Sequence, residues 1–139
     1  MSEVFIDTSA IYAALVREDS AHQAAREAFE RLQRDGVRLV SSSFVAHETI
    51  ALLQVRVGVA AVRTFHQNVL PLLEVVWVDE ALYGTSMTAL LAAARSRISL
   101  TDWSSFEIMR SRGISKALAF DDDFRSQGFE LVNSTTSST

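Results

Sequence analysis

This 139-residue chain contains no cysteine, so disulfide bonds, thiolate metal sites and cysteine nucleophiles are excluded. It has one proline, and its five glycines are scattered, which excludes a G-x-G-x-x-G phosphate loop. No basic stretch followed by an apolar one opens the sequence, so no signal peptide is expected. No apolar run approaches the roughly 20 residues that a membrane-spanning helix needs. These absences favour a soluble, cytoplasmic protein without a membrane partner.

The chain also lacks the basic excess that marks a passive nucleic-acid binder, because it has 13 basic and 17 acidic residues and a net charge of −4. Four acids singled out below account for the whole excess. A nucleic-acid partner is not excluded by this charge, because a bound divalent cation would reverse the local field. Hydrophobic residues make up 48% of the chain, which is enough for a folded core.

Short apolar runs alternate with helical patterns along the whole chain. The runs do not alternate polar with apolar residues, which is typical of strands buried on both faces of a parallel sheet. Strands are predicted at residues 4–6, 37–40, 73–78, 117–120 and 129–132, and helices at 9–17, 21–34, 44–57, 60–69, 80–97 and 103–112. Ser20 and Thr101 are predicted helix caps, and Trp77 is predicted to lie in the core. The pattern predicts a single α/β domain over residues 1–132, a small parallel sheet flanked by helices, followed by a polar tail at 133–139.

Three acids lie where elements begin or end. Asp7 and Asp121 directly follow predicted strands, and Asp102 lies at a helix start. In open α/β sheets, ligands bind beyond the carboxyl ends of the strands. We therefore expect these three carboxylates to converge on one crevice.

Glu48 completes the set from within a helix. Together with Phe44, Leu52 and Val55 it recurs at helical spacing, which predicts a shared apolar face. An unpaired charge is costly on such a face. Carboxylates without sulfur or a histidine cluster are the donors that Mg²⁺ and Mn²⁺ prefer, so the four acids predict a site for a hard cation.

Each acid also has an ordinary structural explanation. Asp7 can cap the following helix, although the adjacent hydroxyls compete for that role. Asp102 suits the first turn of a helix because of the helix dipole. Asp121 can close an Asx-type turn, and Glu48 can pair with a buried arginine. The residues alone leave these explanations open.

Three segments resemble the motifs of PIN-domain proteins. The stretch Val4–Ser9 resembles the family's opening strand, aspartate and small hydroxyl residues. Leu100–Asp102, with the residues up to Met109, is similar to the stretch that carries the third acid, and Ala117–Phe124 is similar to the closing Asp-x-x-Phe motif. The resemblance spans nearly the whole chain and is greatest to the small VapC-type toxins of bacterial toxin–antitoxin pairs.

This resemblance implies a metal-dependent ribonuclease that hydrolyses RNA phosphodiester bonds, has a cognate antitoxin and forms a homodimer. Thr8 or Ser9 would orient a carboxylate or a water, and the role of Asp123 is left open. The metal, Mg²⁺ or Mn²⁺, and the catalytic role would fall on four carboxylates: Asp7, Glu48, Asp102 and Asp121. The basic residues considered for RNA contact are Arg17, Arg110, Arg112, Lys116 and Arg125.

Two other enzyme classes fit the sequence less well. A haloacid-dehalogenase-like enzyme needs a second acid two residues after the first, where this chain has Ser9. A receiver domain needs paired acids after its first strand, where this chain has Thr8. A non-catalytic module that captures a basic peptide in an acidic pocket remains the alternative.

Overall fold

A computed structural model describes residues 2–133 and shows five parallel strands in one sheet, in the order β3-β2-β1-β4-β5. The strands are β1 (Glu3–Ile6), β2 (Arg38–Ser42), β3 (Glu74–Val76), β4 (Lys116–Leu118) and β5 (Glu130–Leu131). The predicted α/β class with a parallel sheet is confirmed.

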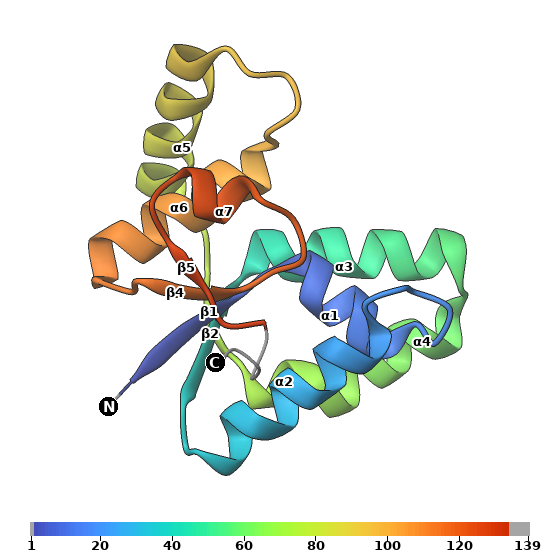
Figure 1. Cartoon of the computed structure of the whole chain (residues 1–139). Helices are drawn as coiled ribbons and strands as arrows, with labels where there is room; N and C mark the ends of the chain where they lie inside the picture. Colours follow the sequence, from blue (N-terminus) through green and yellow to red (C-terminus); the bar gives the residue numbers. More distant parts are fainter. Residues whose placement is uncertain (1, 134–139) are drawn as a thin grey trace.

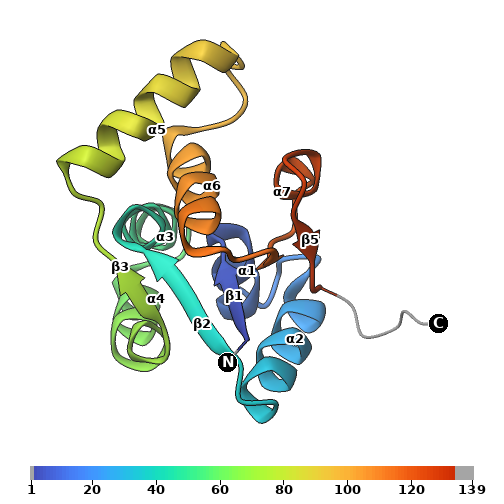
Figure 2. The same ribbon diagram turned by 90° about the vertical axis from the view of Figure 1, so that its left-hand side faces the viewer.

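Helices follow the first four strands and pack around the sheet. In Figure 1, α6 and α7 lie on one side of the sheet and α2 on the other, while α1 and α3 continue from the carboxyl ends of β1 and β2; Figure 2 shows the same arrangement from the side. The helices are α1 (Thr8–Leu15), α2 (His22–Arg34), α3 (Ser43–Arg56), α4 (Val59–Thr64), α5 (Glu80–Ala93), α6 (Leu100–Arg112) and α7 (Asp123–Ser126). A π-helical turn, η1 (Phe65–Val69), and a 3-10 turn, η2 (Leu70–Leu72), connect α4 to β3.

The strand order creates a crevice at the carboxyl end of β1. The chain leaves β1 toward β2 on one side, whereas β4 pairs with β1 on the other side, with Ile6 opposite Leu118. The backbone N–H of Asp7 extends this pairing by donating to the carbonyl of Leu118 at 3.0 Å. A reversal of this kind is where open parallel sheets bind ligands.

An aromatic cluster fixes the elements that border this crevice. Phe5 of β1, Phe106 of α6 and Phe124 of α7 are fully buried, and the rings of Phe106 and Phe124 meet edge to face with centroids 5.0 Å apart. Phe129 stacks on Phe106 with centroids 5.9 Å apart. The cluster therefore fixes α6 and α7 relative to β1.

Several predicted element boundaries were wrong. The predicted helix over 60–69 divides into α4 and the π-helical turn, and the short helix α7 was not predicted. The predicted helix over 80–97 ends at Ala93, because Ala94 takes the left-handed conformation with φ of 53°.

The predicted caps were also displaced. Ser99, not Thr101, caps α6. The side chain of Asp19, not that of Ser20, accepts a hydrogen bond from the backbone N–H of Ala21 before α2.

Asn133, the first residue of the predicted polar tail, is attached to the folded domain. The Asn133 side chain accepts a hydrogen bond from the backbone N–H of Ala119 at 3.2 Å and donates one to the carbonyl of the same residue. The rest of the predicted tail, 134–139, lies outside the described residues. Within 2–133, none of the helices has the length and apolar character required to cross a membrane.

Candidate active site

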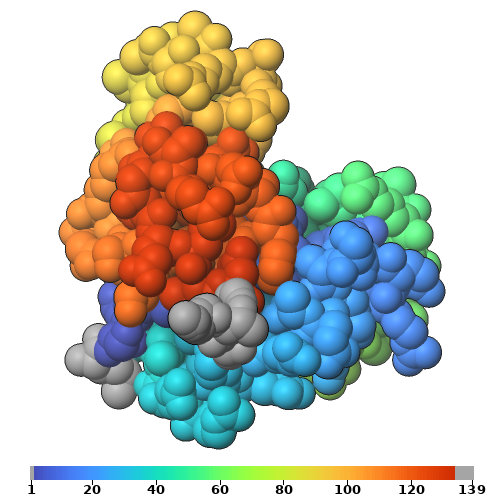
Figure 3. All heavy atoms as spheres, in the orientation of Figure 1, coloured from blue at the N-terminus to red at the C-terminus, as the bar shows by residue number. Residues whose placement is uncertain are grey.

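All four acids singled out from the sequence line one open cavity of about 430 Å³ at the carboxyl ends of β1 and β4. Figure 3 shows the surface hollowed between the C-terminal segments, in orange and red, and the region of α1 and α3, in blue to green. The cavity is lined by Asp7, Thr8, Ser9, Tyr12, Asp19, Ser20, Glu48, Leu52, Arg56, Asp102, Phe120 and Asp121. Asp123, whose role the sequence left open, does not line it; its carboxylate lies 3.6 Å from Arg97.

Asp7 caps α1 and also faces the cavity. Its Oδ2 accepts hydrogen bonds from the Ser9 backbone N–H at 3.2 Å and from the Ser9 hydroxyl at 2.7 Å. The Ser9 hydroxyl in turn accepts from the backbone N–H of Phe120 at 2.9 Å. Ser9 therefore ties the end of β1 to the segment that follows β4, and it holds the Asp7 carboxylate in place.

Glu48 lies on the cavity wall, and the apolar stripe predicted for it is wrong. The buried face of α3 is formed by Val45, Thr49 and Leu53, whereas Glu48 is half-buried and Val55 is 85% exposed. The Thr8 hydroxyl donates to Glu48 Oε1 at 2.8 Å, which links α1 to α3. No lysine or arginine within 2–133 pairs with this carboxylate, so the buried-arginine explanation does not apply.

Asp102 and Asp121 both serve local turns. Asp102 completes a capping box, in which its Oδ2 accepts from the Ser99 backbone N–H at 3.2 Å and its own N–H donates to the Ser99 hydroxyl at 3.1 Å. Asp121 Oδ1 accepts from the backbone N–H of Asp123 at 3.0 Å, as in an Asx turn. The ordinary explanations for these two acids, and for Asp7, are therefore correct at the level of the backbone.

The four carboxylates share one further property. In each of them one oxygen accepts hydrogen bonds from the protein, while the other has no protein donor within the described residues. None of the four has a basic partner within ion-pair distance in that same part of the chain. Capping therefore accounts for half of each carboxylate and leaves the other half available to a ligand in the cavity.

The electrostatics of the cavity reflect this crowding. Burial, and then the negative charges of Asp102 and Asp121, raise the pKa of Asp7 from 3.8 to about 7, although the Ser9 hydrogen bonds oppose the shift. Burial, with the charges of Asp121 and Glu48, raises the pKa of Asp102 to about 6. Burial also raises the pKa of Asp121. A bound cation would relieve the repulsion and favour the ionised forms.

The donor set suits Mg²⁺ or Mn²⁺, since it consists of carboxylate and hydroxyl oxygens. Within residues 2–133, no three acidic or histidine side chains are close enough together to hold one ion directly. This spacing fits an ion that keeps several waters and takes only one or two carboxylates directly, as Mg²⁺ does.

Several residues of the cavity were missed from the sequence, among them Tyr12, Asp19 and Arg56. Helical spacing contained the signal for two of them, because Tyr12 follows Thr8 by one turn and Arg56 follows Glu48 by two. The basic residues that the sequence did suggest for RNA contact do not line the cavity. Arg112, for example, binds Glu3 and Glu74, residues of β1 and β3.

Comparison with known proteins gives three kinds of result. The model of a family described as the PIN domain matches residues 4–130. The solved structure of the Mycobacterium tuberculosis toxin VapC20, described as cleaving the sarcin–ricin loop, is 32% identical, with a TM-score of 0.81 over 94% of this chain and 99% of that one. No curated protein matches significantly.

Two more distant structures share the fold. VapBC2 from Rickettsia felis, bound to a DNA fragment from its promoter, is 14% identical, with a TM-score of 0.68 over 93% of this chain and 96% of that one. FitAcB from Neisseria gonorrhoeae is 16% identical, with a TM-score of 0.66 over 94% of this chain and 96% of that one.

Proposed function

This chain belongs to the PIN-domain family, and from that premise we propose that it is a metal-dependent endoribonuclease, the toxin of a toxin–antitoxin pair. The similarity to VapC20, a toxin described as cleaving the sarcin–ricin loop, supports this proposal over nearly the full length of both chains. We further propose that it acts in the cytoplasm, because a chain without cysteine suits a reducing compartment.

The observation that carries the proposal is the set of four carboxylates around one cavity, each with one oxygen that has no protein donor within residues 2–133. Asp7, Glu48, Asp102 and Asp121 would hold Mg²⁺ or Mn²⁺, partly through water. A bound ion of this kind lowers the pKa of an attacking water and offsets the charge that develops on the phosphodiester. The protein's own contribution is orientation, because Ser9 and Thr8 each hold one oxygen of a carboxylate in position.

Two measurements on the purified chain test this assignment directly. RNA should be cleaved in the presence of Mg²⁺ or Mn²⁺ and left intact in excess EDTA. Calorimetric titration with Mn²⁺ should give binding to the wild type and weak or no binding to Asp7→Asn. Metal binding without RNA cleavage would instead support a module that captures a partner in its acidic cavity.

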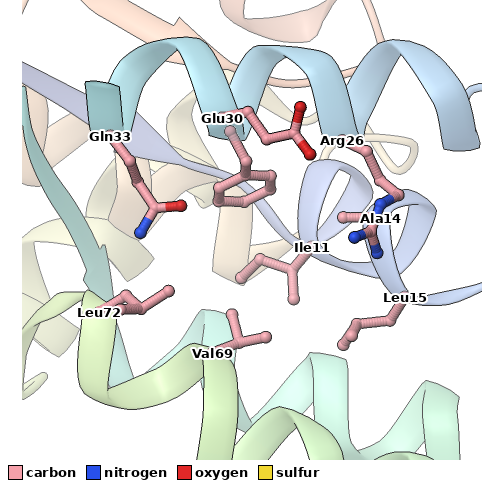
Figure 4. A pocket seen from close by; sticks show the side chains of 9 residues that line it. Ile11, Ala14, Leu15, Arg26, Glu30, Gln33, Val69 and Leu72 are labelled. Carbon is pink, nitrogen blue, oxygen red and sulfur yellow. The ribbon is translucent and has the colours of Figure 1, made fainter. Parts of the chain in front are cut away.

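An apolar groove offers a docking place for the antitoxin. It lies between α1, α2 and the η1–η2 turns, and Figure 4 shows Val69 and Leu72 on one wall and Ile11 and Leu15 on the other. Arg26, Glu30 and Gln33 form its polar rim. A helix with one apolar face would fill such a groove, and the similarity to the VapBC2 and FitAcB complexes supports a protein partner of this kind.

Expression of the wild-type chain is expected to arrest bacterial growth, and co-expression of its genomic neighbour should relieve the arrest. Leu72→Asp places a charge in the groove at a residue that is already 49% exposed, so the variant should fold and remain toxic. Co-expression of the genomic neighbour should no longer relieve the growth arrest that this variant causes. Val59→Asp, at a 61% exposed residue outside the groove, is the matched control and should still be relieved. Colony counts under induction measure both effects. If co-expression relieves the growth arrest by Leu72→Asp as completely as that by the wild type, the groove is not the docking place.

We also propose that the chain forms a homodimer through α5. This helix stands away from the sheet in both ribbon views, and it carries Tyr83 and Leu91, 47% and 67% exposed, with Trp77 at 75% exposed just before it. Large apolar side chains exposed on a projecting helix and just before it are typical of an interface. Sedimentation velocity should give a dimer for the wild type and a monomer for Leu91→Asp; a monomeric wild type at micromolar concentration would contradict the proposal.

A further inference from the structure

Arg56 is the one basic residue among those that line the acidic cavity, as far as the described chain shows. It lies at the end of α3 and is exposed. Although Asp19 and Glu48 line the same cavity, Arg56 forms no ion pair with a carboxylate of residues 2–133. A guanidinium beside several acids that pairs with none of them is available to a different anion.

The contact that Arg56 does make leaves its hydrogen-bond donors available. Its guanidinium carbon lies 5.5 Å from the centroid of the Tyr12 ring. When a guanidinium stacks its flat face on a ring, the N–H groups in its plane remain available for bidentate binding of an oxyanion. Tyr12 is half-buried on α1, which gives the guanidinium a firm support.

Arg56 lies two helical turns beyond Glu48 on α3. Glu48, Leu52 and Arg56 follow one another at intervals of one turn along α3, so the backbone of Arg56 lies about 12 Å along the helix from that of Glu48. On α1, Tyr12 follows Thr8 by one turn. The two neighbouring helices thus present the Thr8–Glu48 pair at the inner end of the cavity and the Tyr12–Arg56 pair at the outer end.

We propose that Arg56, supported by the Tyr12 ring, binds an RNA phosphate adjacent to the one that is cleaved and thereby positions the strand across the carboxylates. This inference rests on the ribonuclease function proposed above. Arg56 would supply the positive charge that the chain as a whole lacks, at the place where an acidic cavity would otherwise repel RNA. It is a substrate-binding residue in this scheme and takes no part in bond breaking.

The test is equilibrium binding of a short single-stranded RNA to the Asp7→Asn chain in Mg²⁺, which avoids cleavage. Adding Arg56→Gln should weaken binding about 10-fold and reduce the slope of log K against log salt by about 0.7, the contribution of one phosphate contact to a single strand. Arg63→Gln, which removes an equal charge from an exposed site on α4, should leave both values unchanged. In the otherwise wild-type enzyme, Arg56→Gln should raise KM and leave kcat nearly unaltered.

Tyr12 has its own pair of variants. Tyr12→Leu should reproduce part of the Arg56→Gln loss, and Tyr12→Phe, which keeps the ring, should restore the binding that Tyr12→Leu loses. If the wild type cleaves RNA while Arg56→Gln binds it with unchanged affinity and salt slope, the inference is overturned and the ribonuclease function stands. An equal loss in Arg63→Gln would also overturn it, because the effect would then be one of net charge. A wild type that neither binds nor cleaves RNA would remove the proposed function itself, and this inference with it.

Discussion

Asp7→Asn and Asp102→Asn are each expected to reduce metal-dependent RNA cleavage by at least about 10²–10³-fold, the usual cost of removing one group that stabilises charge in a transition state. Asparagine keeps an oxygen that can accept the capping hydrogen bonds from Ser9 and Ser99, so both variants should fold. What they lose is the negative charge on the oxygen that faces the cavity. Single-turnover cleavage of a labelled RNA, with and without Mn²⁺, measures the effect.

Asp122→Asn is the matched control for these variants. It makes the same chemical change next to Asp121 of the cavity, but the Asp122 side chain is 87% exposed and contacts Arg125 instead of the cavity. Its cleavage rate should stay within a few-fold of the wild type. Full activity in both cavity variants, or cleavage by the wild type in excess EDTA, would show that these carboxylates do not form a catalytic metal site.

The second large expected effect is a loss of folding stability with rising pH in the absence of metal. The folded-state pKa of Asp7 is about 7, above its ordinary value of 3.8, so between those values the folded chain binds more protons than the unfolded chain. Stability from this group is therefore present below about pH 4 and is lost as pH rises through about 7. The loss is on the order of 4 kcal/mol, because each tenfold change in proton affinity corresponds to about 1.4 kcal/mol.

Asp7→Asn removes the contribution of Asp7 to the pH dependence of stability, because asparagine does not titrate. In EDTA, chemical denaturation from pH 4 to pH 8 should show the wild type losing stability relative to Asp7→Asn, and the variant should melt at or above the wild-type temperature at pH 8. Asp35→Asn, at an exposed aspartate at the end of α2, should follow the wild type at every pH.

Saturating Mn²⁺ should narrow this difference in stability at pH 8. A ligand that binds only the folded chain adds about 2.7 kcal/mol at a concentration of 100 times its Kd, and Asp7→Asn should gain much less than the wild type. Parallel stability curves for the two chains in EDTA, or a melting temperature unmoved by Mn²⁺, would argue against a formed site at Asp7.

The α/β class with a parallel sheet and the PIN-domain family were determined by the sequence itself and are confirmed. Apolar runs without alternation predict parallel strands because both faces of such strands are buried. The positions of Asp7 and Asp121 at strand ends follow from the same pattern, since parallel strands end at one edge of the sheet. These inferences need only local sequence and a general rule of topology.

Capping illustrates where local reasoning was incomplete. The sequence set structural and ligand-binding explanations for Asp7, Asp102 and Asp121 against each other, but the folded chain gives each of them both a local hydrogen bond and a place on the cavity. A carboxylate has two oxygens, and only their orientation in space shows that one of them is left without a protein donor. Their role in metal binding stays a prediction.

The tertiary structure alone decided which helix faces meet. Glu48 was selected for an apolar stripe that does not exist, since α3 buries Val45 and Leu53 instead, and Trp77 was expected in the core but is exposed. The Tyr12–Arg56 contact joins residues 44 positions apart in the sequence and left no local signal beyond helical spacing. Which side of a helix is buried depends on the elements that pack against it, and these come from distant parts of the chain. Local sequence can therefore place charges along an element, but only the packing of α1 against α3 brings an arginine to an acidic cavity.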